Sequence, residues 1–114
     1  MVAVLVVDDE PGVRRLLDLV LREVGYRVSV AADAEAALQA VEEFDPDVVL
    51  TDIRLPGMNG MELAERIRNH SNRYRARIVL MSAYGRPCQA STEAFVSKPF
   101  DMDRVLAAVK GLAS

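Results

Sequence analysis

Three carboxylates, one hydroxyl and one ammonium group stand where short apolar runs of this sequence end. These groups belong to Asp8, Asp9, Asp52, Ser82 and Lys98. Carboxylates that lie close together repel one another unless a cation is bound between them. Mg²⁺ prefers oxygen ligands, which the three acids would supply. If the fold gathers these five residues, their chemistry is that of phosphoryl transfer to a carboxylate.

Each of the five residues has a candidate role in that chemistry. Asp52 is the candidate nucleophile that would form an aspartyl phosphate, and Asp8 and Asp9 would hold Mg²⁺ directly or through water. Lys98 would bind one phosphoryl oxygen as a compact positive charge, and the Ser82 hydroxyl would donate a hydrogen bond to another. Lys98 is suggestive because Arg supplies 12 of the 14 basic residues of the chain.

Ordinary structural explanations exist for each residue taken alone. Asp8 or Asp9 could cap a helix that begins at Pro11, and the pair Lys98-Pro99 is common in turns. A single serine such as Ser82 carries no information. The signal is therefore the joint occurrence of these residues at the ends of successive strands.

The elements that must position these residues alternate between strand and helix. Apolar runs predict strands over residues 3–7, 26–31, 47–52, 78–81 and 95–97. Apolar residues at helical spacing predict helices over residues 13–24, 34–43, 61–69 and 101–112. Asp33 is the expected N-cap of the second helix, and Gly25 the expected end of the first.

This alternation predicts an α/β fold with a doubly wound, flavodoxin-like parallel sheet of five strands in the order 2-1-3-4-5, covered by helices on both faces. The carboxyl ends of the first and third strands are then neighbours at the switch point, where such sheets bind ligands. Asp8, Asp9 and Asp52 should lie within a few ångströms of one another. Only 12 residues, 83–94, separate the last two strands, so the fourth helix should be short or missing.

Length and composition exclude several classes of protein. A chain of 114 residues, 51% of them hydrophobic, predicts one domain over residues 1–114 and no output domain. The net charge of -3 argues against binding to nucleic acid or an anionic membrane. The apolar runs are too short to cross a bilayer, and the single Cys88 cannot form an internal disulfide. We therefore expect a cytoplasmic protein.

Four motifs resemble those of the receiver domain of two-component response regulators. They are VVDDE at residues 6–10, DIRLPGMNG at 52–60, MSAY at 81–84 and KPF at 98–100. The resemblance covers essentially the whole chain. It implies a phosphoacceptor module that switches protein–protein interactions and catalyses only its own phosphorylation and dephosphorylation, so that it is not an enzyme in the usual sense.

The resemblance also implies a role for particular residues. Asp52 would be the phosphoacceptor, and Mg²⁺ would be bound by Asp8, Asp9, Asp52 and the backbone carbonyl of Arg54. Lys98 would contact the phosphoryl group, whereas Ser82 and Phe95 would form a switch pair whose side chains move on phosphorylation. The implied partners are a sensor histidine kinase or histidine phosphotransfer protein and an unidentified downstream protein, and a homodimer is compatible with this family.

Other functions remain open on the sequence alone. A receiver-like interaction module that no longer switches would share this fold, but such a module could lose Asp9 or Lys98, and both are present. A phosphatase of the haloacid-dehalogenase type would need an Asp-x-Asp motif after the first strand and room for a cap domain. A flavin carrier would need Ser, Thr and Gly there to bind phosphate, where this chain has acids.

Overall fold

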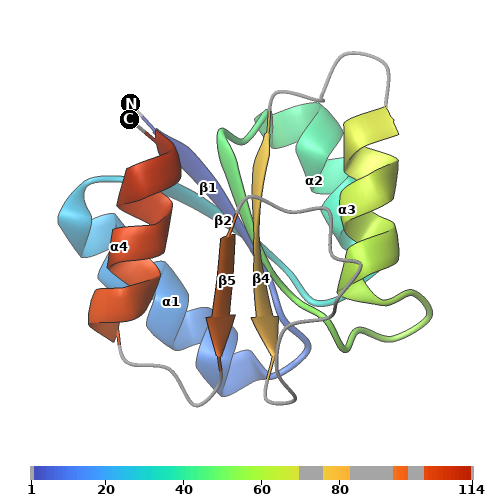
Figure 1. Ribbon diagram of the computed structural model, residues 1–114, viewed down its shortest axis with the longest axis horizontal. Helices are drawn as coiled ribbons and strands as arrows, with labels where there is room; N and C mark the ends of the chain where they lie inside the picture. Colours follow the sequence, from blue (N-terminus) through green and yellow to red (C-terminus); the bar gives the residue numbers. More distant parts are fainter. Residues whose placement is uncertain (1, 70–75, 83–93, 98–101, 114) are drawn as a thin grey trace.

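The computed structural model describes residues 2–69, 76–82, 94–97 and 102–113, which form five strands and four helices (Figure 1). The strands are β1 (Ala3–Val7), β2 (Arg27–Ala31), β3 (Val48–Asp52), β4 (Arg77–Ser82) and β5 (Ala94–Ser97). The helices are α1 (Pro11–Val24), α2 (Ala34–Phe44), α3 (Gly60–Asn69) and α4 (Met102–Ala113). The boundaries expected from the sequence agree with these to within two residues.

All five strands are parallel and lie in the order β2-β1-β3-β4-β5, so the predicted topology is confirmed. At the carboxyl end of β1, Val7 is paired with Ala31 of β2 and with Thr51 of β3. Asp8, which follows Val7, therefore emerges beside Asp52. The segment between β4 and β5, where we expect a short or missing helix, lies outside the described residues.

Two aliphatic layers hold the sheet, one on each face. Leu5 and Val7 of β1 belong to the layer under α2 and α3, while Val4 and Val6 belong to the layer under α1 and α4 (Figure 1). All four side chains are fully buried. Because both faces of the strand are covered, its sequence is continuously apolar rather than alternating.

The helix ends follow local sequence signals. Asp33 caps α2, because its carboxylate accepts a hydrogen bond of 2.8 Å from the backbone N–H of Ala36. Gly25 ends α1 with φ +110°, a conformation that glycine adopts readily. The sequence predicted both the Asp33 cap and the end of α1 at Gly25. None of the helices in the described ranges has the length and hydrophobicity needed to span a lipid bilayer.

β2 forms one edge of the sheet and is partly shielded by a side chain of α1. Arg22 donates a hydrogen bond of 2.8 Å from Nη2 to the backbone carbonyl of Val28. Its Nε is paired with the carboxylate of Asp18, one helical turn earlier. Arg22 thus links the last turn of α1 to the edge strand.

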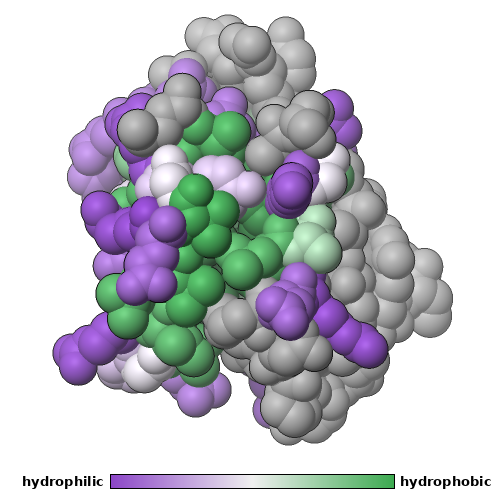
Figure 2. Space-filling model, turned by 90° about the vertical axis from the view of Figure 1, so that its left-hand side faces the viewer, coloured by the Kyte–Doolittle hydropathy of each residue, from purple (hydrophilic) through white to green (hydrophobic). Residues whose placement is uncertain are grey.

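One side of the molecule carries exposed hydrophobic residues. Figure 2 looks on to the side that bears α1 and α4 and shows a band of hydrophobic surface there. The exposed large hydrophobic residues of the described chain are Leu16, Leu19, Val24 and Val30. Three of them belong to α1, the helix that begins directly beyond the paired acids. A contiguous exposed apolar surface commonly marks a site of protein–protein contact.

Candidate functional site

Three acids converge where β1 and β3 end. Asp8, Asp9 and Asp52 can each offer a carboxylate oxygen, and these three atoms lie within 4.8 Å of one another. Asp8 is 0% exposed and Asp52 is 7% exposed, whereas Asp9 is exposed to solvent. The structure therefore brings together the three acids that the sequence placed at neighbouring strand ends, and leaves the group open on one side.

Asp8 is fixed by the turn that joins β1 to α1. Its backbone N–H donates a hydrogen bond of 3.1 Å to the carbonyl of Ala31, which extends the contact with β2. Its Oδ1 accepts a hydrogen bond of 3.0 Å from the backbone N–H of Glu10. The backbone carbonyl of Asp8 accepts a third hydrogen bond, of 2.7 Å, from Nη1 of Arg14. Asp8 is thus held at its N–H, its carboxylate and its carbonyl.

The N-terminus of α1 excludes one alternative explanation for the paired acids, that either of them caps this helix. Neither Asp8 nor Asp9 is the N-cap of this helix. The N-cap is Glu10, whose side chain makes no capping hydrogen bond, and Pro11 begins the helix. Proline lacks an N–H, so one of the unpaired backbone donors of the first turn does not exist. The Asp8 carboxylate instead binds the N–H of Glu10 just outside the helix, which leaves Asp9 directed to the site.

Asp52 is held by its own strand and by the loop that follows. Its Oδ1 accepts a hydrogen bond of 3.4 Å from the backbone N–H of Arg54. Its carbonyl accepts a hydrogen bond of 3.0 Å from the hydroxyl of Thr51, which is fully buried. The next residue, Ile53, donates to the carbonyl of Met81 at 3.0 Å, so the contact with β4 continues past Asp52.

The loop between β3 and α3 closes tightly on Asp52. The N–H of Gly60 donates a hydrogen bond of 2.6 Å to the carbonyl of Ile53. A Cβ atom at Gly60 would lie only 2.3 Å from the carbonyl oxygen of Asp52, so no larger residue fits there without movement of the backbone. Gly57, with φ +81°, makes the turn at the loop tip. The short closure brings the Arg54 backbone beside the acids.

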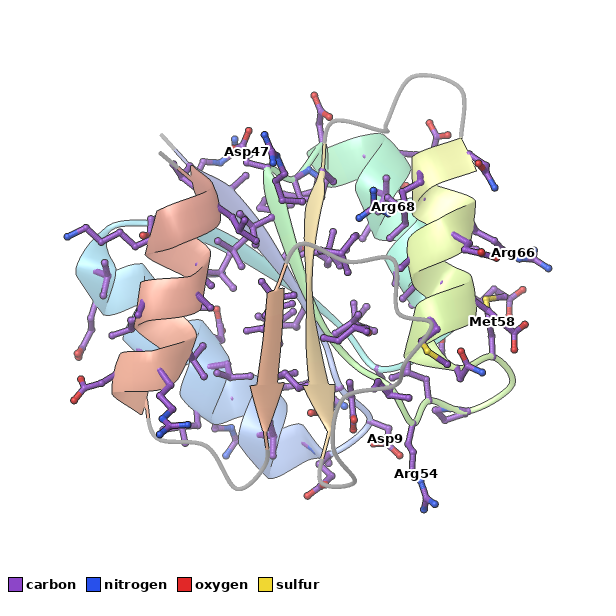
Figure 3. All side chains as sticks on the ribbon, viewed as in Figure 1. Asp9, Asp47, Arg54, Met58, Arg66 and Arg68 are labelled. Atoms are coloured by element: carbon purple, nitrogen blue, oxygen red, sulfur yellow. The ribbon has the colours of Figure 1, made fainter. Side chains whose placement is uncertain are left out.

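An open hollow of about 470 Å³ adjoins the acids at the carboxyl edge of the sheet. It is lined by Asp9, Ile53, Arg54, Leu55, Pro56 and Asn59. Figure 3 shows Asp9 and Arg54 at this edge, with the Arg54 side chain directed away from the protein. Asp47 lies at the opposite edge, where it binds the N–H of Ala3. Only the carboxyl edge therefore combines clustered acids with an accessible hollow among the described residues.

The donor set of the three acids fits a small hard cation. Carboxylate oxygens are the ligands that Mg²⁺ prefers in proteins, and the open side leaves room for the waters that this ion retains. Two of the acids are buried, which makes their mutual repulsion costly in the absence of a cation. The arrangement can therefore bind a divalent ion and, beside it, an anionic group.

Three predicted site residues cannot be placed from the described structure. Lys98 lies outside the described residues, and so do the side chains of Ser82 and Phe95. The backbone of Ser82 ends β4 opposite Ser97 of β5, at the same edge of the sheet as the acids. The roles of all three side chains stay predictions.

Three residues that support the site were not found by sequence reasoning. Thr51 could have been noticed, because it places a hydroxyl between the apolar residues of this strand and Asp52. Gly60 belongs to a loop rich in turn residues, where no pattern distinguishes a glycine needed for close packing from one needed for a turn. Arg14 gives no signal, because a charged residue on an amphipathic helix normally faces solvent.

Comparisons of the sequence with known proteins all point to one family. A model of the "Response regulator receiver domain" matches residues 4–110. Sporulation initiation phosphotransferase F of Bacillus subtilis is 38% identical over 94% of this chain and 90% of that protein. Regulatory protein AtoC of Escherichia coli is 36% identical over 90% of this chain but only 23% of that protein. The chain thus spans nearly all of one relative and under a quarter of another.

Solved structures agree with these matches. A putative response regulator from Chloroflexus aurantiacus superimposes with a TM-score of 0.89 at 33% identity, covering 97% of this chain and 96% of that one. TrrA of Thermotoga maritima, solved in complex with Mg²⁺-BeF, gives 0.88 at 38% identity over 98% and 99% of the two chains. TrrA has also been solved in complex with the histidine kinase ThkA; that chain gives a TM-score of 0.88 at 38% identity, covering 100% of both chains. The chain belongs to the receiver domain family of two-component response regulators.

Proposed function

We propose that this receiver domain accepts a phosphoryl group on Asp52. The observation that carries the proposal is the convergence of Asp8, Asp9 and Asp52 within 4.8 Å at the switch point of the sheet. Three acids beside an open hollow, at the place where open parallel sheets bind their ligands, support a binding site here.

Mg²⁺ is the proposed cofactor. Asp8, Asp9 and Asp52 would hold it through carboxylate oxygens, together with the backbone carbonyl of Arg54. When bound, the ion offsets the negative charge of the acids and of the incoming phosphoryl oxygens. The relative TrrA, which was solved with Mg²⁺-BeF, supports this assignment.

The reaction that we propose is a direct displacement at phosphorus. A carboxylate oxygen of Asp52 forms the new O–P bond while the P–N bond to a donor phosphohistidine breaks, and the electron pair of that bond stays on the imidazole nitrogen. The N–H of Arg54 orients the attacking carboxylate through its contact with Oδ1. Lys98 and Ser82 bind the remaining phosphoryl oxygens, and Ser82 with Phe95 transmits the change to the surface.

The donor that we propose is a sensor histidine kinase or a histidine phosphotransfer protein in the cytoplasm. The TrrA–ThkA complex supports a kinase as partner. On this chain the exposed hydrophobic residues Leu16 and Leu19 of α1, the helix that follows the paired acids, offer a docking surface. The domain would use its own site once per phosphoryl group and pass the signal to a downstream protein, rather than turn over a free substrate.

Intact-mass measurement after incubation with Mg²⁺ and acetyl phosphate tests the function. We expect the wild-type chain to gain one phosphoryl group and Asp52→Asn to gain none, because the amide is a poor nucleophile. Wild type without Mg²⁺ is the matched control for the cofactor. If the wild type gains nothing and binds no Mg²⁺, a receiver-like module that does not switch becomes the better description. If it binds Mg²⁺ but gains nothing, the site needs a protein donor.

A further inference from the structure

Arg14 reaches from α1 to the backbone of the acidic turn. Its Nη1 donates a hydrogen bond of 2.7 Å to the carbonyl of Asp8, six residues earlier in the chain. The Arg14 side chain is half-buried, whereas that of its neighbour Arg15 is exposed. A hydrogen bond from a charged guanidinium to a partly buried carbonyl is stronger than one between neutral groups. The contact is therefore well suited to fix the position of the turn.

The turn needs such support because its geometry decides where two acids point. Asp8 and Asp9 leave β1 in succession, and their carboxylates must stay within 4.8 Å of each other and of Asp52 despite their mutual repulsion. The Asp8 N–H is tied to β2 and its Oδ1 to Glu10. Arg14 ties the third polar group, the carbonyl, to the first turns of α1.

We propose that Arg14 is a positioning residue of the metal site. By holding the Asp8 carbonyl it sets the spacing of the Asp8 and Asp9 carboxylates that a small octahedral ion requires. The inference rests on the Mg²⁺ site proposed above. Residues that orient metal ligands without touching the metal commonly change metal affinity by 10- to 100-fold when they are replaced.

The positive charge of Arg14 weakens cation binding, whereas its proposed positioning of the acids strengthens it. A guanidinium bound to the backbone of Asp8 reduces the negative potential at the acids and so weakens the attraction for Mg²⁺. Removal of Arg14 should therefore tighten binding if charge dominates, and weaken it if positioning dominates. The sign of the change separates the two effects.

Calorimetric titration of the full chain with Mg²⁺ and, separately, with Ca²⁺ tests this role. In Arg14→Met, which keeps the apolar stem, we expect the Kd for Mg²⁺ to rise about tenfold. The Kd for Ca²⁺ should rise less, because Ca²⁺ tolerates irregular coordination and Mg²⁺ does not. Arg15→Met removes the same charge from an adjacent exposed position and should leave the ratio of the two Kd values unchanged.

The titrations distinguish failure of the positioning role of Arg14 from failure of the proposed metal site. An Arg14→Met chain that binds Mg²⁺ as tightly as the wild type, or that changes both Kd values by the same factor, overturns the positioning role. A wild-type chain that binds no Mg²⁺ overturns the metal site itself. If Arg14→Met does not keep the native circular dichroism spectrum, Arg14→Lys provides the same comparison, because Lys keeps the charge but places its donors differently.

Discussion

Gly60 sets how closely α3 can begin beside the carboxyl end of β3. Its hydrogen atom faces the carbonyl oxygen of Asp52, where a Cβ would lie at 2.3 Å. The distance to the Cα of Ile53 would be 2.9 Å, so the obstruction is backbone and cannot turn aside. Gly60, the first residue of α3, is therefore required for packing, whereas Gly57 in the preceding loop is required for its positive φ.

Gly60→Ala should lower the free energy of unfolding by about 1–3 kcal/mol, the usual cost of forcing a methyl group into a packed region. Urea unfolding followed by circular dichroism measures this. Gly111→Ala is the control, because a Cβ there meets no atom within 4 Å and Ala is the better helix former. Equal behaviour of the two variants would show that the close contact with Asp52 is relaxed in solution.

At the scale of single elements, α2 illustrates how a local signal decides a boundary. The Asp33 carboxylate satisfies the N–H of Ala36, and Glu35 adds a favourable negative charge in the first turn. The helix ends at Asp45, whose φ of 51° lies in the left-handed region just before Pro46. Both ends could be foreseen, because the residue types that make them are few.

Asp33→Ala should destabilise the domain by about 1 kcal/mol through loss of the cap of α2. Asp33→Ser, which retains a side-chain acceptor, should recover most of that loss. Thermal or urea unfolding of both variants beside the wild type gives the comparison. A loss of the same size in Asp33→Ser would mean that the charge of Asp33, rather than the cap, is what stabilises the helix.

The elements could be predicted more completely than their contacts. The apolar runs of the strands and the spacing of apolar residues in the helices are patterns carried by many residues at once, so the strand order and the meeting of Asp8 with Asp52 could be predicted from them. The Arg14 contact with Asp8 and the Gly60 contact with Asp52 depend on distances between single atoms. No periodic pattern records such distances, and the sequence therefore does not reveal them.

At the scale of the whole molecule, the acidic site joins two central strands. Asp8 and Asp9 follow β1 while Asp52 ends β3, so an ion held by all three would link the two halves of the sheet. Folding and metal binding are then coupled, since the unfolded chain has no such cluster. The stability of the domain should respond to Mg²⁺ even without phosphorylation.

Mg²⁺ at 100 times its Kd should raise the free energy of unfolding by about 2.7 kcal/mol. Asp9→Asn should lose most of this gain, because one of the three charged ligands is replaced by a neutral amide. In buffer with a chelator, Asp9→Asn should be at least as stable as the wild type, since it removes one of three crowded charges. Urea titrations with and without Mg²⁺ measure these changes. If Mg²⁺ raises the free energy of unfolding of Asp9→Asn as much as that of the wild type, Asp9 is not a ligand.

The Arg22 guanidinium at the edge of β2 affects whether copies of the domain can associate through their sheets. An open sheet edge offers unpaired carbonyls on which the strand of another molecule can add, and this is a common route to fibrous aggregates. Arg22 occupies the Val28 carbonyl and places a charge where an incoming strand would have to lie. The edge is thus partly protected by a residue of a neighbouring helix, which opposes the edge-to-edge joining of sheets from different copies of the domain.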